Sequence, residues 1–130
     1  MARAFLIGVA LLALSATPAR AAQVSAEYLL NICAFGSDGK EIIPSGHTTC
    51  QSYIAGVMDY HSFTRSLGVS SSYDFCLPKG ETLNRIHRKV QDFLIKNRAQ
   101  YGPFIASPAV MVALSEAYPC PKKANRPKRR

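Results

Sequence analysis

Residues 48–67, TTCQSYIAGVMDYHSFTRSL, decide the fold class, because this proline-free stretch has the periodicity of a long helix. At 100° per residue, small polar side chains occupy one narrow arc and large apolar side chains most of the remainder. Thr48 and Gln51 fit a capping box at the start, and Gly68 ends the helix. Gly56 lowers the stability of a helix by about 1 kcal/mol relative to alanine. Close approach of a neighbouring helix would compensate for this loss, so we expect such a contact there. The segment therefore predicts a central helix. Its apolar positions are Tyr53, Ile54, Val57, Tyr60, Phe63 and Leu67.

Three further helices are predicted around this one. Residues 24–35 and residues 82–97 each place apolar side chains on one side at helical spacing. Ser107 caps another helix with Pro108 at its first position, and Pro119 ends it. Residues 36–46 and 68–80 are rich in turn-forming residues and predict loops. Because no segment alternates like a strand, we expect an all-α bundle of four, or four to five, helices.

Residues 1–22 have the pattern of a signal peptide. Arg3 supplies a basic start, residues 4–16 are uncharged and apolar, and residues 19–21 form an A-x-A cleavage site. The alternative is a membrane anchor, but the apolar run is shorter than the roughly 20 residues that a spanning helix needs. We therefore expect export to the periplasm, with residues 1–22 removed, a helical domain at residues 23–120 and a tail at residues 121–130.

The four cysteines all lie in the predicted mature chain, and an even number in an exported protein favours disulfides. Successive helices joined by short loops tend to be antiparallel, which brings the end of one beside the start of the next. The predicted pairs are therefore Cys33–Cys50 and Cys76–Cys120. Zinc is the alternative, since His47 lies three residues before Cys50, but no C-x-x-C pair is present, so we predict no metal site.

The net charge of +8 is concentrated at the carboxyl end. Two of the sixteen basic residues lie in the predicted signal peptide and six in the last nine positions, which leaves eight against eight acidic residues in the body. A basic run with prolines and almost no apolar residue predicts a solvated, disordered tail. Nucleic-acid binding conflicts with the export signal, whereas weak attraction to anionic surfaces stays an alternative. The six residues are Lys122, Lys123, Arg126, Lys128, Arg129 and Arg130.

Groups that could catalyse a reaction are few and scattered. We expect His47 in a loop, His61 on the apolar side of its helix and His87 at the border of an apolar stripe. Asp59 and His61 are two residues apart in a helix, so their side chains point in different directions. Disulfide pairing leaves no cysteine as a nucleophile, and no glycine-rich phosphate loop follows a strand. We therefore predict neither an enzyme nor a cofactor, and expect the loops of a rigid bundle to bind a protein.

Residues 50–59, CQSYIAGVMD, resemble the C-x-x-Y-I-x-G-V-x-D signature of the Rap/Tai immunity proteins of type VI secretion systems. Residues 75–78, FCLP, and residues 113–120, ALSEAYPC, resemble later parts of the same family in the same order, and Cys33 fills the remaining cysteine position. The resemblance covers residues 24–120. Besides the cysteines, the residues that carry it are Tyr53, Ile54, Gly56, Val57, Asp59, Pro78 and Pro119.

The resemblance implies a periplasmic helical protein that binds a peptidoglycan-cleaving amidase effector and blocks its active-site cleft. It implies no catalysis and no cofactor. We do not assign the motif residues as partner contacts, because packing or capping also explains them. The alternative is a general cell-envelope binding or chaperone-like protein without a toxin partner. A homodimer is compatible with either function.

Overall fold

The structure is a computed structural model that describes residues 23–69 and 71–121. The predicted signal peptide, residues 1–22, and residues 122–130 of the predicted tail lie outside the described residues. Within the described part, no helix combines the length and hydropathy that a bilayer-spanning segment requires.

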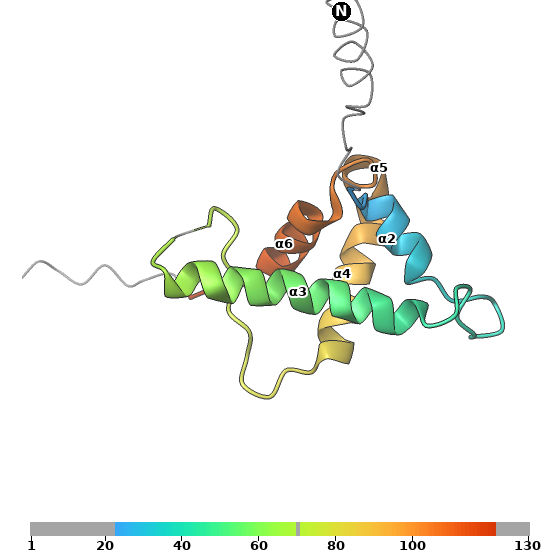
Figure 1. Cartoon of the computed structure of the whole chain (residues 1–130), viewed down its shortest axis with the longest axis horizontal. Coiled ribbons are helices and arrows are strands. Elements are labelled where there is room, and N and C mark those ends of the chain that lie inside the picture. Colours follow the sequence, from blue (N-terminus) through green and yellow to red (C-terminus); the bar gives the residue numbers. More distant parts are fainter. Residues whose placement is uncertain (1–22, 70, 122–130) are drawn as a thin grey trace, which may run out of the picture.

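The described residues form five helices and no named strand, which confirms the predicted all-α class. Figure 1 shows α3 along the long axis of the molecule, with α2, α4 and α6 crossing its direction. These four helices all contact one another, and the short α5 adds a turn against α2 and α4. The helices are α2 (Ala26–Ile32), α3 (Gly46–Ser66), α4 (Leu83–Lys96), α5 (Arg98–Tyr101) and α6 (Ala106–Ala117).

The central helix is α6 rather than the predicted α3. Half of the residues of α6 are buried, and small alanine side chains at several of these positions let α2, α3 and α4 pack closely around it. In α3 the buried residues follow helical spacing along a single face. The prediction of a central α3 was wrong because a broad apolar arc does not reveal how much of it neighbouring helices cover. The buried residues of α6 are Ala106, Ala109, Val110, Val112, Ala113 and Leu114.

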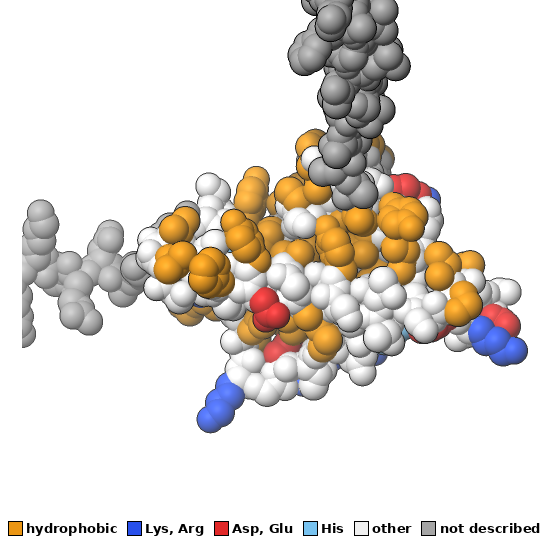
Figure 2. All heavy atoms as spheres, viewed as in Figure 1, with side chains coloured by type: hydrophobic (Ala, Val, Ile, Leu, Met, Phe, Trp, Pro, Cys, Tyr) orange, Lys and Arg blue, Asp and Glu red, His pale blue; other side chains and the backbone are white. Residues whose placement is uncertain are grey.

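The carboxyl-terminal half of α3 carries large apolar side chains that stay in contact with solvent. Tyr60 is 69% exposed, Phe63 58% and Leu67 63%, although we predicted that they would be covered. Figure 2 shows apolar side chains gathered over this end of α3. The helix extends beyond the other helices here, so among the described residues no helix covers the outer part of its apolar arc.

The start of α3 also differs from the prediction. The helix begins at Gly46, and the preceding Ser45 has a positive φ of 60° and no side-chain cap. Thr48 therefore lies inside the helix, and the predicted capping box is wrong. Gln51 instead donates a hydrogen bond to Oδ1 of Asn84 on α4.

Two glycines of α3 have opposite environments. A Cβ on Gly46 would lie 2.2 Å from the carbonyl oxygen of Ile32, so this glycine lets the start of α3 meet the end of α2. A Cβ on Gly56 would meet nothing within 4 Å. The predicted close approach of a helix at Gly56 is therefore wrong, and the close approach occurs at Gly46.

Caps fix two other helix starts and correct a third. Ser25 accepts a hydrogen bond from the backbone of Tyr28 at the start of α2, and Thr82 accepts one from Arg85 at the start of α4. The last long helix begins at Ala106, one residue before the predicted cap Ser107. Because Ser107 already lies within α6, its hydroxyl contacts another helix instead of the backbone.

The two disulfides join the predicted pairs, Cys33–Cys50 and Cys76–Cys120. Their Cα–Cα distances are 5.5 Å and 4.8 Å, within the usual range for a disulfide. The first ties the end of α2 to the first turns of α3. The second joins Cys76, in the α3–α4 connection (residues 67–82), to Cys120, which follows α6. It therefore holds this connection to the carboxyl end of the domain.

Candidate functional site

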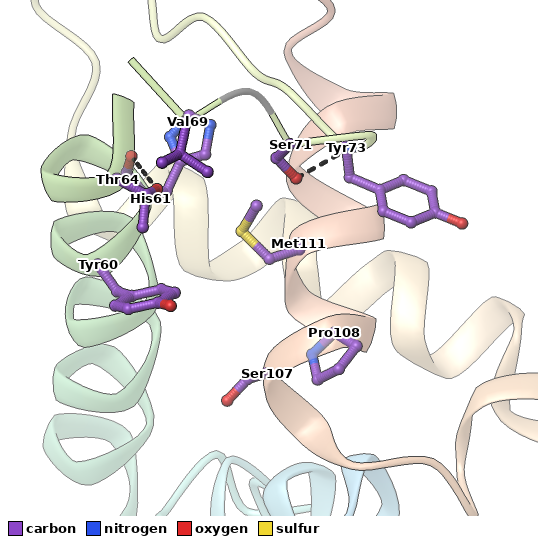
Figure 3. Close-up of a pocket in the computed structure, with 9 residues that line it drawn as sticks. All are labelled: Tyr60, His61, Thr64, Val69, Ser71, Tyr73, Ser107, Pro108 and Met111. Atoms are coloured by element: carbon purple, nitrogen blue, oxygen red, sulfur yellow. Dashed lines mark hydrogen bonds between the residues drawn. The ribbon is translucent and has the colours of Figure 1, made fainter. Parts of the chain in front are cut away.

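A groove of about 420 Å³ lies between the end of α3, the start of α6 and the α3–α4 connection. We call it the α3–α6 groove. The lining residues come from α3, the connection and α6. Figure 3 shows Tyr60 and Met111 facing the space between α3 and α6, whereas the ring of Tyr73 points away from it. Tyr60 and Thr64 come from α3, Val69 and Tyr73 from the connection, and Met111 from α6.

The groove is lined by uncharged, largely apolar side chains. None of its lining residues is Asp, Glu, Lys or Arg. Several hydroxyl groups are already engaged inside the protein: Thr64 donates to the carbonyl oxygen of His61, and Oγ of Ser107 lies 2.8 Å from the hydroxyl of Tyr53. The Ser71 hydroxyl accepts from the backbone of Tyr73. An apolar group would therefore enter at little desolvation cost, whereas a charged group would find no partner.

One buried histidine fixes the connection that forms the groove wall. Nε2 of His61 lies 2.8 Å from Oδ1 of Asp74, and Nη1 of Arg65 lies 3.6 Å from the same oxygen. The His61 ring also stacks on Phe75, with 4.1 Å between the ring centroids. A carboxylate, an imidazole and an aromatic ring thus attach the connection to the side of α3.

The wall is also tied to the carboxyl end of the domain. Phe75 forms an isolated antiparallel bridge with Pro119, and the backbone of Cys76 donates to the carbonyl oxygen of Tyr118 at 2.9 Å. The Cys76–Cys120 disulfide makes this junction covalent. Residues 74–76 are therefore held at both α3 and α6, and the groove between these helices is largely preformed.

The sequence did not single out the groove residues as a site. Tyr60 was predicted as a core or rim residue, and Val69, Tyr73 and Met111 received no role. Asp74 was also missed as the partner of His61, since we had considered only Asp59, which is exposed. Residues 60–73 do carry a signal for the groove. Large apolar residues continue there beyond the last buried position of α3 and into the serine-rich connection.

The other two histidines lie together at the opposite end of α3. His47, predicted in a loop, lies in the first turn of α3, and its ring is 4.7 Å from that of His87. Nε2 of His87 is 3.1 Å from Sγ of Cys50. Burial, with the nearby His47 as a smaller cause, lowers the pKa of His87 below its ordinary value. Burial therefore disfavours the charged form of the His87 ring, which packs in the interior beside the partly buried His47.

The same cluster contains the groups that a metal would need. The ligand atoms of Cys33, Cys50 and His87 lie within 4.8 Å of one another. Both sulfurs are joined in a disulfide, however, and zinc requires thiolates. The residues therefore do not fit a zinc site while the disulfide is intact.

The motif residues divide between the core and the surface. Ile54 and Val57 are buried, and Tyr53 is partly buried beside Ser107. Gly56 and Asp59 are both exposed on α3. Packing therefore explains the aliphatic positions of the motif, but it does not explain these two.

Proline positions of the motif lie at chain turns. Pro78 is exposed, and its carbonyl oxygen accepts a hydrogen bond from the backbone of Glu81 just before α4. Pro119 pairs with Phe75 at the base of the groove wall. Both prolines help to place the ends of the α3–α4 connection.

Together, the fold and the groove define an all-helical, disulfide-linked binding domain whose surface is suited to another protein. The chain matches the family model of Rap1a immunity proteins over residues 25–120, and it belongs to this family. The family consists of inhibitors rather than enzymes, and an immunity protein has a protein partner. Among curated proteins and solved structures, none matches this chain significantly.

Proposed function

We propose that this chain is a periplasmic immunity protein that binds and inhibits a peptidoglycan amidase effector of a type VI secretion system. The observation that carries the proposal is the family match over residues 25–120, which includes both disulfides and the α3–α6 groove. The signature of residues 50–59 supports the type VI and amidase parts through the family that it resembles.

Two features support the compartment. Both cysteine pairs are oxidised, which is typical of proteins that function outside the reducing cytoplasm. Residues 1–22 carry the basic start, apolar run and A-x-A site of a signal peptide. An inhibitor of a wall-degrading enzyme must meet that enzyme where the wall lies, so export fits the proposed partner.

The proposal is tested by co-expression with a candidate amidase from the neighbouring locus, directed to the periplasm. Cells that carry the full chain should survive induction of the amidase, and the two proteins should co-elute on gel filtration. A variant that lacks residues 1–22 is the matched control, because it stays in the cytoplasm and should give no protection. Survival no better than with an empty vector, together with no complex, would contradict the proposal.

A second function, general binding to the cell envelope, is favoured by one observation. Six basic residues lie in the last nine positions, and such a segment is attracted to anionic headgroups and acidic polymers. Deletion of residues 122–130 separates the two functions. We expect toxin neutralisation to survive this truncation, while any binding to anionic vesicles or isolated cell wall should fall. Loss of protection on truncation would instead favour the envelope function.

A further inference from the structure

The apolar side chains around the α3–α6 groove are costly to leave in water without a partner. Tyr60, Val69 and Tyr73 line it and are 69%, 56% and 51% exposed. Phe63 and Leu67 extend the same apolar surface along α3. A hollow rimmed by large apolar groups is characteristic of an interaction site, whereas single exposed apolar residues are common on any protein surface.

The charges around the groove restrict what can occupy it. The lining contains no Asp, Glu, Lys or Arg side chain to pair with an incoming charge. The chain's own carboxyl-terminal segment begins beside the groove wall at Cys120, but it carries six basic residues in its last nine. Burying those cations among uncharged groups would be unfavourable. An uncharged apolar group fits the lining, and the tail does not.

The chain also contains an uncharged apolar run at residues 4–16. That run belongs to the proposed signal peptide and is absent from the exported protein. The remaining sources of an apolar occupant are a second copy of this chain and the protein that it inhibits. Of these, the inhibited protein is the partner that membership of an immunity family requires.

The groove is prepared for such an occupant. Its wall is held by the His61–Asp74 contact and by the Cys76–Cys120 disulfide, so little chain has to be ordered when a partner binds. Its volume of about 420 Å³ lies within the range of about 300–1,000 Å³ that is usual for ligand pockets. A large side chain that is desolvated in a rigid pocket is the typical energetic centre of a protein interface.

We infer that the α3–α6 groove receives an uncharged aliphatic or aromatic side chain that projects from the inhibited effector. The inference rests on the proposed function and deepens it by naming the surface and the chemistry of the contact. Met111 lies between α3 and α6, and the exposed ring of Tyr60 points across the groove toward α6, so these two side chains would contact the entering group.

Substitutions at Val69 test the inference most directly, because this side chain is exposed and its replacement should not disturb the core. Isothermal titration of the mature chain, from Gln23, with the purified amidase from the neighbouring locus measures the dissociation constant. Val69→Glu and Val69→Lys should both weaken binding about tenfold or more, since either charge would be desolvated in the complex. Ile42→Glu and Ile42→Lys are the matched controls, because Ile42 is an exposed apolar loop residue outside the groove, and both should bind like the wild type.

Tyr28 supplies the matched control for a change at Tyr60. Tyr28 is 57% exposed on α2, outside the groove. Tyr60→Ser should weaken binding at least about tenfold, whereas Tyr28→Ser should change it less than about threefold. Thermal unfolding followed by circular dichroism should show that all variants keep the wild-type helical content.

The outcomes distinguish failure of the groove from failure of the function. If the wild type binds the amidase and both charged Val69 variants bind equally well, the groove inference is overturned. It is likewise overturned if the mature chain alone elutes as a dimer on gel filtration and Val69→Glu converts it to a monomer, because a second copy then occupies the groove. It is also overturned if only one sign of charge weakens binding, because that result indicates long-range electrostatics. If the wild type forms no complex, the proposed function fails, and the groove inference falls with it.

Discussion

Nε2 of His61 lies 2.8 Å from Oδ1 of Asp74, and this contact joins the carboxyl-terminal half of α3 to the α3–α4 connection. The imidazole is buried, whereas the carboxylate is partly exposed. The pair therefore attaches the solvent-exposed α3–α4 connection to a buried side chain of α3. Because the same loop forms one wall of the α3–α6 groove, the contact links the stability of the domain to the shape of its candidate binding surface.

Loss of the Asp74 carboxylate should destabilise the domain. Asp74→Ala leaves a ring nitrogen of buried His61 without its partner, which should lower the free energy of unfolding by about 1–3 kcal/mol. Urea denaturation under non-reducing conditions measures the change. Asp38→Ala is the control, because Asp38 is an exposed loop aspartate, and it should shift stability by less than about 0.5 kcal/mol. Equal stability of the two variants would contradict the role given to the contact.

The two disulfides should contribute unequally. They close loops with sequence separations of 17 and 44 residues, for which chain entropy gives about 3 and about 4 kcal/mol. Replacing both cysteines of a pair by alanine should therefore cost more for Cys76 and Cys120 than for Cys33 and Cys50. Denaturant unfolding of each double variant provides the comparison. A thiol assay of the denatured wild type should find no free sulfhydryl, and reactive thiols there would refute the pairing.

Alanine substitutions at the two glycines of α3 should have opposite effects. Gly56→Ala adds a methyl group to open space in a helix and should stabilise the domain by about 0.5–1 kcal/mol. Gly46→Ala places a methyl group against the carbonyl oxygen of Ile32 and should be destabilising. Thermal unfolding of both variants and the wild type tests these predictions: the melting temperature should rise for Gly56→Ala and fall for Gly46→Ala. A destabilised Gly56→Ala would show that a neighbour lies closer to this glycine than the structure places it.

The free energy of unfolding should fall as the pH drops below about 6.5, which is the ordinary pKa of a histidine side chain. Burial and the nearby His47 lower the pKa of His87, so the unfolded chain takes up a proton there before the folded chain does. Above this pH both states are neutral at His87, and the residue adds no pH dependence. One such proton gives a slope of up to about 1.4 kcal/mol per pH unit.

Urea denaturation between pH 7.5 and 5.5 measures this dependence. His87→Leu should flatten the profile, since it removes the titrating ring and keeps an apolar group in the interior. This window lies above the pH at which the carboxyls of Glu27 and Glu81 titrate, whose pKa values are lowered by hydrogen bonds and nearby arginines. An unchanged slope in His87→Leu would assign the dependence to another group.

Local sequence determined the helices and the cross-links of this protein. Ser25 and Thr82 cap helices because short polar side chains satisfy free backbone donors, and this requires only neighbouring residues. The disulfide pairs followed from the order of the helices, since Cys33 ends one helix and Cys50 begins the next. These features depend on interactions between residues near in sequence or on simple chain connectivity.

Only the tertiary structure decided which apolar surfaces are buried and which form a site. The sequence shows that α3 and α6 are both rich in apolar residues, but burial depends on how much of each helix its neighbours cover. Each contacts three other helices, yet half of the α6 residues are buried and only five of the 21 in α3. Tyr60 stays exposed because α3 extends past its neighbours, and Asp74 meets His61 because the Cys76–Cys120 disulfide and the Phe75–Pro119 bridge position the connection. The helical periodicity of a segment specifies its apolar face, whereas the three-dimensional packing of all segments specifies what covers that face.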